Sequence, residues 1–103
     1  MEVKWLDMMI VVAYDVNTET PQGRKRLRMV AKTCMQYGQR VQNSVFECLV
    51  SPSDYILLKT QLQSIINEEK DGLRFYNLGK KYESKIEQTG TIRHVPTDSP
   101  MII

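Results

Sequence analysis

The strongest pattern in the chain is a continuous apolar run over Met8–Tyr14, which ends abruptly at Asp15. The run contains β-branched residues and a turn-forming segment follows it, so a strand buried on both faces is predicted over 8–15. A carboxylate at the mouth of such a strand needs compensation, because burying an unpaired charge costs several kcal/mol. Asp15 is therefore expected to be either a turn cap or a metal ligand.

A helix is predicted directly after that strand. Thr20 and Pro21 are typical of an N-cap followed by a first-turn proline. Apolar residues then recur at helical spacing, which indicates one narrow buried stripe, and Gly38 is expected to end the helix in a left-handed conformation. The stripe consists of Leu27, Val30, Ala31 and Cys34.

The pattern then changes to period two, which predicts a strand over 39–50 that is apolar on both faces. Ser51 and Pro52 are expected to open a second helix, which ends near Asp71 and Gly72. Its expected buried stripe consists of Tyr55, Leu58, Leu62, Ile65 and Ile66. A further strand is predicted at 73–78, and a weaker one at 82–88.

We interpret these elements as the order β, α, β, β, α, β of an α+β ferredoxin-like sandwich, in which two helices cover one face of a four-stranded antiparallel sheet. The other face of such a sheet is normally polar, yet the first two strands are apolar on both sides. A two-fold homodimer packed sheet to sheet is therefore predicted. A monomer whose tail folds over its own sheet is the alternative.

The length of 103 residues fits one domain. We expect a peripheral N-terminal extension at 1–7, the ferredoxin-like domain at 8–90, and an extended C-terminal tail at 91–103. In one arrangement this tail is an extra strand on the edge of the partner's sheet.

Composition limits the function classes further. The formal net charge of +2 is too small to indicate a nucleic-acid partner without clustering. No segment reaches the roughly 20 apolar residues of a membrane span, so no membrane association is expected. Cys34 and Cys48 lack metal-ligand spacing and lie among apolar neighbours, which favours reduced thiols in a cytoplasmic protein.

A dimer gives Asp15 a second interpretation. Two-fold symmetry near the ends of the first strands would bring two copies of Asp15 together, and paired carboxylates favour a hard cation such as Mg²⁺, or Mn²⁺ in its place. Such a metal can activate water and neutralise phosphate in phosphodiester hydrolysis. From the residues alone, capping of the following turn is the more common role for an aspartate.

The densest charge lies on the first predicted helix, where a run of cations contains no acidic residue: Arg24, Lys25, Arg26, Arg28 and Lys32. Cations at a helix start oppose the helix dipole, so a polyanion is expected to favour them there, and nucleic-acid phosphates suit arginine. Candidate extensions of this nucleic-acid-binding surface are Arg40, Arg74, Lys80 and Lys81. A solvated helix face is the alternative.

One serine and three tyrosines are weaker candidates. Ser44 lies between apolar neighbours on the second predicted strand, where it either faces the dimer axis near the metal or only fills space. Tyr14, Tyr37 and Tyr76 are candidates for stacking on bases, although aromatic residues beside strands are more often part of the core.

Four segments together resemble the CRISPR-associated (Cas) protein two family over residues 8 to about 88. They are the strand end Tyr14–Val16, GRKRL at 23–27, YGQRVQNSVFEC at 37–48 and LRFYNLG at 73–79. The third is the most specific. This segment, together with a chain end of proline followed by three apolar residues, is similar to the type I-C branch of the family.

The resemblance implies a ferredoxin-like homodimer that joins the larger CRISPR integrase subunit in spacer acquisition. It also implies a metal-dependent endonuclease acting on single-stranded RNA or double-stranded DNA. The family's metal aspartate falls on Asp15, and its second-strand serine and phenylalanine fall on Ser44 and Phe46, which implies that Ser44 lies near the active cleft. The extra residues 1–7 depart from the family pattern.

Three other functions stay open. A non-catalytic dimeric scaffold would bridge integrase subunits and measure DNA with its basic helices. A toxin-type ribonuclease shares the expected fold. A ligand-sensing regulator would need a polar pocket between subunits, and no recognisable ligand motif is present.

Overall fold

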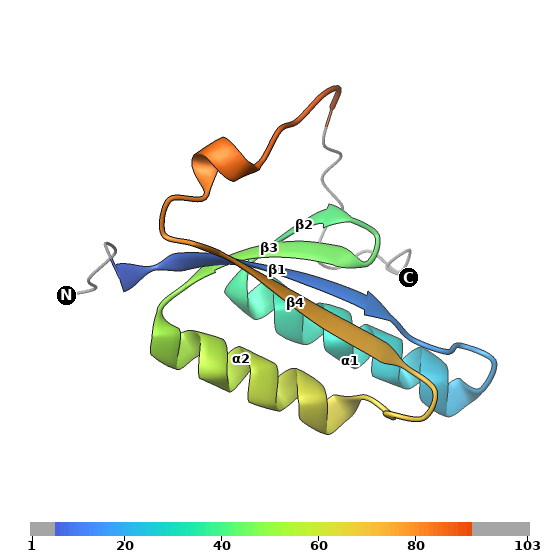
Figure 1. Cartoon of the computed structure of the whole chain (residues 1–103). Helices are drawn as coiled ribbons and strands as arrows, with labels where there is room; N and C mark the ends of the chain where they lie inside the picture. The colour runs from blue at the N-terminus through green and yellow to red at the C-terminus, as the bar shows by residue number, and fades with distance from the viewer. Residues whose placement is uncertain (1–5, 92–103) are drawn as a thin grey trace.

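A computed structural model describes residues 6–91 of the chain (Figure 1). The helices and strands follow in this order: β1 (Met8–Asp15), α1 (Pro21–Tyr37), β2 (Gln39–Gln42), β3 (Val45–Val50), α2 (Pro52–Ile65) and β4 (Gly72–Gly79). The expected extension at 1–7 and tail at 91–103 lie almost wholly outside the described residues.

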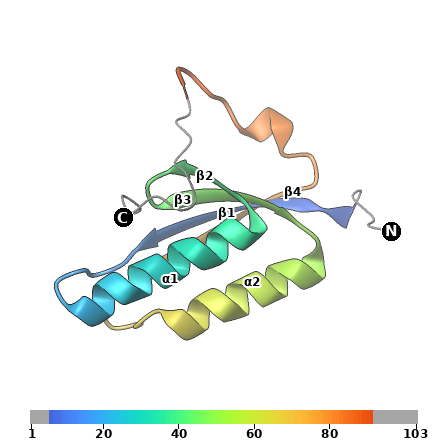
Figure 2. The same ribbon diagram turned by 180° about the vertical axis from the view of Figure 1, so that it is seen from behind.

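The four strands form one antiparallel sheet in the order β2-β3-β1-β4. Both helices lie on the same face of this sheet, and the segment after β4 lies on the opposite side (Figures 1 and 2). The predicted α+β architecture, with the βαββαβ order and the two-layer arrangement, is therefore confirmed.

The segment expected as one strand over 39–50 is a hairpin. Asn43 and Ser44 form the turn between β2 and β3. The two strands of this hairpin are the second and third strands of the βαββαβ order, and β4 is the fourth. The expected strand at 82–88 is wrong. Local hydrogen bonds make a short 3-10 helix there instead, Glu83–Lys85, in which the Lys85 amide donates to the Tyr82 carbonyl oxygen over 2.8 Å.

The start of α1 follows the prediction, because the Thr20 hydroxyl accepts from the Gly23 amide over 3.0 Å and Pro21 is the first helical residue. The end differs. Gly38 has a φ of −163°, which is extended rather than left-handed. A side chain at this position would contact the Glu47 carbonyl oxygen and lie 2.6 Å from the Cys48 sulfur, so glycine allows close packing of α1 against β3.

The second helix is shorter than expected. It begins with the predicted cap, since the Ser51 hydroxyl accepts from the Asp54 amide over 3.2 Å. It ends at Ile65, because Ile66 is already extended, and the residues up to Asp71 form a loop.

The core lies between the sheet and the helices. Alternate residues of β1 and β3 point toward the helices. The apolar stripes predicted for the two helices face these strand residues. The largest fully buried side chains are Ile10, Val12, Val30, Cys34, Phe46, Cys48, Leu58 and Leu62. The remaining residues of β1, which include Val11, Ala13 and Asp15, lie on the opposite face of the sheet. The candidate site at Asp15 is therefore away from the core.

Candidate functional site at the end of strand β1

Asp15 is the last residue of β1, and it is exposed. Its partner across the β1–β4 ladder is Gly72, which has no side chain to cover the carboxylate. Within residues 6–91, no hydrogen bond or ion pair engages the Asp15 carboxylate. An open hollow of about 420 Å³ between β1 and β4 lies beside it. A free carboxylate is thus exposed next to a space that a ligand can enter.

The turn-capping role is filled by another residue, Asp71, whose side chain is 0% exposed. Its Oδ1 accepts from the Asn17 amide over 3.0 Å, and its Oδ2 accepts from the Asn67 amide over 2.9 Å. These bonds close the loops after β1 and before β4. The interpretation of Asp15 as a turn cap is therefore wrong, because Asp71 satisfies the backbone that Asp15 was expected to satisfy.

Arg26 completes this arrangement. Its Nε donates to Asp71 Oδ2 over 2.7 Å and its Nη2 donates to Oδ1 over 3.3 Å. Burial acts to raise the pKa of the Asp71 carboxyl, but the hydrogen bonds from Arg26, Asn67 and Asn17 outweigh it and lower the pKa below its ordinary value. Arg26 is thus held in an internal ion pair rather than facing solvent with its neighbours on α1.

Arg40 does not extend the exposed basic surface, since it is only 7% exposed. Its guanidinium lies 4.9 Å from the centroid of the Phe46 ring, and its Nη1 donates to the Asn43 carbonyl oxygen. Within the described part of the chain, its buried Nη2 has no hydrogen-bond partner. The structure therefore places Arg40 inside the β2–β3 hairpin, with no open path to a phosphate backbone.

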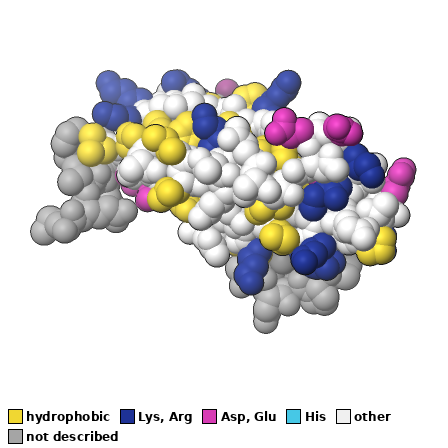
Figure 3. All heavy atoms as spheres, turned by 90° about the horizontal axis from the view of Figure 1, so that it is seen from below, with side chains coloured by type: hydrophobic (Ala, Val, Ile, Leu, Met, Phe, Trp, Pro, Cys, Tyr) yellow, Lys and Arg dark blue, Asp and Glu magenta, His cyan; other side chains and the backbone are white. Residues whose placement is uncertain are grey.

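The other predicted cations are exposed on α1: Arg24, Lys25, Arg28 and Lys32. Arg24, Arg28 and Lys32 recur every four residues, so they form one stripe along the helix. Figure 3 looks onto the helix layer, where several Lys and Arg side chains reach the surface. Four of the five cations predicted on this helix to bind nucleic acid thus remain accessible.

Ser44 lies beside the end of β1. The Tyr14 amide donates to the Ser44 carbonyl oxygen over 3.1 Å, which continues the β1–β3 ladder to the residue before Asp15. The Tyr14 hydroxyl donates to the Asn43 carbonyl oxygen over 3.4 Å. The β2–β3 turn is therefore fixed to the strand that carries Asp15, and this brings Ser44 to the same end of the sheet.

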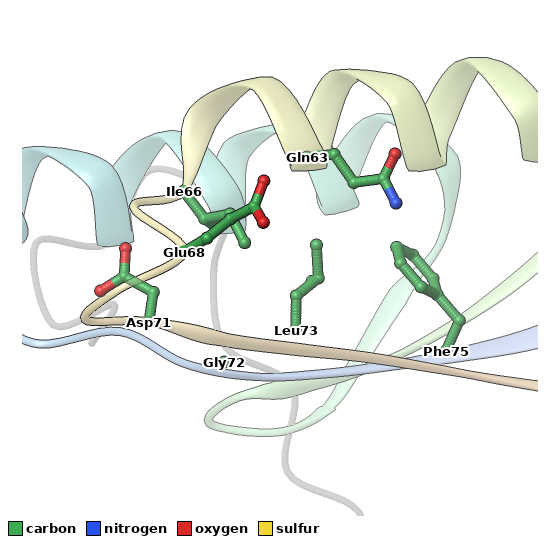
Figure 4. A pocket seen from close by; sticks show the side chains of 7 residues that line it. All are labelled: Gln63, Ile66, Glu68, Asp71, Gly72, Leu73 and Phe75. Atoms are coloured by element: carbon green, nitrogen blue, oxygen red, sulfur yellow. The ribbon is translucent and has the colours of Figure 1, made fainter.

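A larger hollow of about 630 Å³ lies on the helix side, between the end of α2 and β4 (Figure 4). Its lining includes Leu73 and Phe75 from β4 and Glu68 and Asp71 from the loop. The Asp71 carboxylate is already bonded to Arg26. The other carboxylate of this hollow, Glu68, is exposed and comes from a loop rather than from the end of a strand.

The residues at Asp15 fit a hard divalent cation. Within residues 6–91, no group of three His, Cys, Asp or Glu side chains is placed to hold a metal. Mg²⁺ needs no such cage, because it is usually bound by one or two carboxylates and keeps water and substrate phosphates as its other ligands. One free carboxylate beside an open hollow matches that pattern.

The fold and this site define a small α+β protein of split βαβ topology with a free carboxylate at the end of its central strand and a basic helix. The family model described as CRISPR associated protein Cas2 matches residues 8–86. The chain belongs to the Cas2 family.

Relatives of nearly equal length support this assignment. The CRISPR-associated endonuclease Cas2 of Halalkalibacterium halodurans is 50% identical over 95 residues, which cover 92% of this chain and 99% of the relative. The CRISPR-associated endoribonuclease Cas2 of Chlorobaculum tepidum is 52% identical over 83 residues, covering 81% and 86%. The crystal structure of Streptococcus pyogenes Cas2 at pH 6.5 matches with a TM-score of 0.70 and 59% identity, over 81% of this chain and 100% of that one.

No described helix has both the length and the apolar character needed to cross a membrane. The functional roles expected from the sequence for Asp15, Ser44 and the cations of α1 stay predictions, and the structural role of Asp71 was not predicted. A signal was present, since Asp71 precedes Gly72 between a predicted helix and a strand, a position where an aspartate often bonds to the backbone.

Proposed function

We propose that this chain is a metal-dependent CRISPR endonuclease in which Asp15 holds Mg²⁺ or Mn²⁺. The observation that carries the proposal is the free, exposed Asp15 carboxylate beside an open hollow. Two relatives, a CRISPR-associated endonuclease and a CRISPR-associated endoribonuclease, support the reaction class. The substrate we infer is single-stranded RNA or double-stranded DNA, and the YGQRVQNSVFEC segment supports a place in the type I-C-like branch.

The proposed reaction is phosphodiester hydrolysis. A water oxygen forms a bond to phosphorus, the bond from phosphorus to the leaving sugar oxygen breaks, and that oxygen takes up a proton. Bound Mg²⁺ would supply charge neutralisation and a more acidic water. Asp15 holds the ion, and Ser44 contributes its hydroxyl group from the adjoining β2–β3 turn. Burial raises the pKa of the Tyr14 hydroxyl to about 12, so we do not assign it the role of base.

The exposed cations of α1 are proposed to bind the phosphate backbone. Lys and Arg on a nucleic-acid surface gain affinity by releasing counterions, and a stripe of cations along one helix suits a repeating phosphate chain. Arg24, Arg28 and Lys32 provide such a stripe, and Lys25 lies beside it.

We further propose a homodimer in which the sheet faces opposite the helices pack together. This face carries the apolar residues Val11 and Ala13 on β1 and Leu49, which is 44% exposed, on β3, with Glu47 opposite Val11. A second copy would bury this surface and would add a second Asp15 near the first, if the axis passes the ends of the two β1 strands. The dimer would also present two basic helices to a CRISPR integrase subunit.

The decisive test compares Asp15→Asn with Glu19→Gln, which changes an exposed acid in the following loop. Labelled single-stranded RNA and double-stranded DNA are incubated with each protein in Mg²⁺, Mn²⁺ or EDTA. Asp15→Asn should abolish cleavage and weaken Mn²⁺ binding measured by calorimetry, whereas Glu19→Gln should change neither. Cleavage by Asp15→Asn at the wild-type rate would contradict the proposal.

A non-catalytic scaffold is the second candidate function, favoured by the exposed cations Arg24, Arg28 and Lys32 on α1, which would bind nucleic acid without cleaving it. The two functions separate in cells. If Asp15→Asn loses cleavage but still supports spacer acquisition together with the integrase, the scaffold role carries the biological function. If acquisition stops with cleavage, the nuclease role does.

A further inference from the structure

The hollow beside Asp15 contains a second charged group, Arg74 of β4. In the β1–β4 register, Asp15 is opposite Gly72, Ala13 is opposite Arg74, and Val11 is opposite Tyr76. Alternate residues of a strand share a face, so Arg74 and Tyr76 lie on the same side of the sheet as Asp15. Arg74 is a diagonal neighbour of Asp15, a separation that a long side chain can span.

Gly72 leaves space between these groups. A side-chain carbon at this position would lie 3.9 Å from the Asp15 Cβ, so any larger residue would occupy the volume in front of the carboxylate. The hollow is consequently open where Asp15 and Arg74 both reach it.

Arg74 is held by Tyr76 and by no acid. Its Nη1 donates to the Tyr76 hydroxyl oxygen over 3.2 Å, and its guanidinium carbon lies 5.8 Å from the Tyr76 ring centroid. Across residues 6–91, no carboxylate forms an ion pair with Arg74. A guanidinium has five N–H donors and stays charged at all relevant pH values, so most of its donors remain free for an anion.

We propose that Arg74 binds the phosphate group that is cut at Asp15, and that Tyr76 is a positioning residue for Arg74. This proposal rests on the proposed nuclease function. Asp15 alone would repel a phosphate, and the guanidinium of Arg74, which lines the same hollow, offsets that repulsion. The planar fork of Arg74 matches two non-bridging phosphate oxygens, so it both binds and orients the phosphate.

Three variants test the roles of these side chains. Arg74→Gln removes the charge, Arg74→Lys keeps the charge but removes the fork, and Tyr76→Phe keeps the ring but removes the hydroxyl. Lys59→Gln is the matched control, because Lys59 lies 5.1 Å from the Tyr55 ring centroid on α2, away from the hollow.

Cleavage kinetics are measured in Mg²⁺ with a single-stranded RNA. Arg74→Gln should lower kcat/KM by about 100-fold, the size expected for removing one donor that binds the reacting phosphate. Arg74→Lys should recover part of this loss. Tyr76→Phe should lower kcat by about 5-fold with little change in KM, since a misdirected guanidinium still attracts the substrate. Lys59→Gln should resemble the wild type, and all variants should unfold at the wild-type temperature.

A binding measurement in EDTA gives an independent result. The affinity for the same RNA is measured by fluorescence anisotropy across salt concentrations, with Asp15→Asn as the background. Adding Arg74→Gln should reduce the salt slope by about one, whereas adding Lys59→Gln should not.

The outcomes separate the two proposals. If Asp15→Asn is inactive but Arg74→Gln has wild-type kcat/KM and an unchanged salt slope, the Arg74 proposal is wrong and the nuclease proposal stands. If Asp15→Asn cleaves normally, the nuclease proposal fails. In that case a lower salt slope for Arg74→Gln still supports phosphate binding at Arg74, and an unchanged slope overturns it.

Discussion

Arg26 on α1 and Asp71 in the loop before β4 are joined by two side-chain hydrogen bonds, 2.7 and 3.3 Å long. Asp71 also accepts from the amide of Asn17, two residues after Asp15. This one carboxylate therefore ties together the start of the basic helix, the loop that follows Asp15 and the loop that precedes Gly72. The geometry around the candidate site depends on a residue that does not face the hollow beside Asp15.

Replacing Asp71 by Asn should destabilise the protein by about 3 kcal/mol, because removing one partner of a buried ion pair leaves the other uncompensated. The free energy of unfolding is measured by urea titration. Glu69→Gln, an exposed change in the same loop, is the control and should alter it by less than about 0.5 kcal/mol. Equal stability of Asp71→Asn and the wild type would show that the ion pair contributes nothing.

The same carboxyl predicts how stability depends on pH in acid. Because its pKa is lower in the folded state than in the unfolded state, the unfolded chain binds the proton more readily. The stabilisation is complete above the ordinary pKa of about 3.9 and is lost as the pH falls through the lowered value. Urea titrations between pH 6 and pH 3 should show a steeper loss for the wild type than for Asp71→Asn.

Arg40 and Arg28 should behave differently although both were predicted to bind nucleic acid. Arg40→Met should cost about 2 kcal/mol of stability, because it removes the charged hydrogen bond to the Asn43 carbonyl oxygen and the contact of the guanidinium with the Phe46 ring. Arg28→Gln should leave stability unchanged and reduce the salt slope of RNA binding by about one, since Arg28 is exposed. A folded Arg40→Met with a reduced salt slope would contradict the structural role assigned here.

Local patterns predicted the parts of the fold that depend on short-range chemistry. The caps Thr20 and Ser51, the buried stripes and the strand ending at Asp15 all follow from side chains within a few residues of one another. The hairpin was missed because Val41, Val45 and Leu49 keep an even spacing across the turn, although the consecutive polar residues Gln42, Asn43 and Ser44 interrupt the alternation and supply a turn signal.

The candidate site was only partly predictable for a different reason. Asp15 stands out in sequence because a charge follows an apolar run. Arg26 and Arg40 look like their exposed neighbours until the partners that bind them, Asp71 and Asn43, are brought close by the fold. Those partners are distant in sequence or are backbone groups, and neither type of contact has a periodic signature.

The proposed dimer predicts a clear difference between two exposed apolar residues. Leu49→Glu places a charge on the sheet face opposite the helices and should weaken self-association by about 30-fold or more. Ile56→Glu, at a position 63% exposed on α2, should not. Sedimentation equilibrium measures both. A monomeric wild type, or equal association by the two variants, would contradict packing through the sheet face.

The two cysteines predict how the protein responds to thiol reagents and to alkaline pH. Both are free and buried, as expected, and burial raises each thiol pKa from 9.0 to about 12, with a smaller contribution from Cys48 at Cys34 and from Glu47 at Cys48. The folded protein should therefore react with iodoacetamide at pH 8 about 1000-fold more slowly than in urea, because the thiolate is the nucleophile.

The same shifts make the folded state hold more protons than the unfolded state between pH 9 and about 12, so the free energy of unfolding should fall as the pH rises through that range. Urea titrations at pH 8 and pH 10 measure the change. A Cys34→Ala, Cys48→Ala double variant should lose most of this dependence, and the remaining part should come from Tyr14, whose raised pKa has the same sign. Equal stability of the wild type at the two pH values, or rapid labelling without urea, would show that the thiols are accessible to solvent.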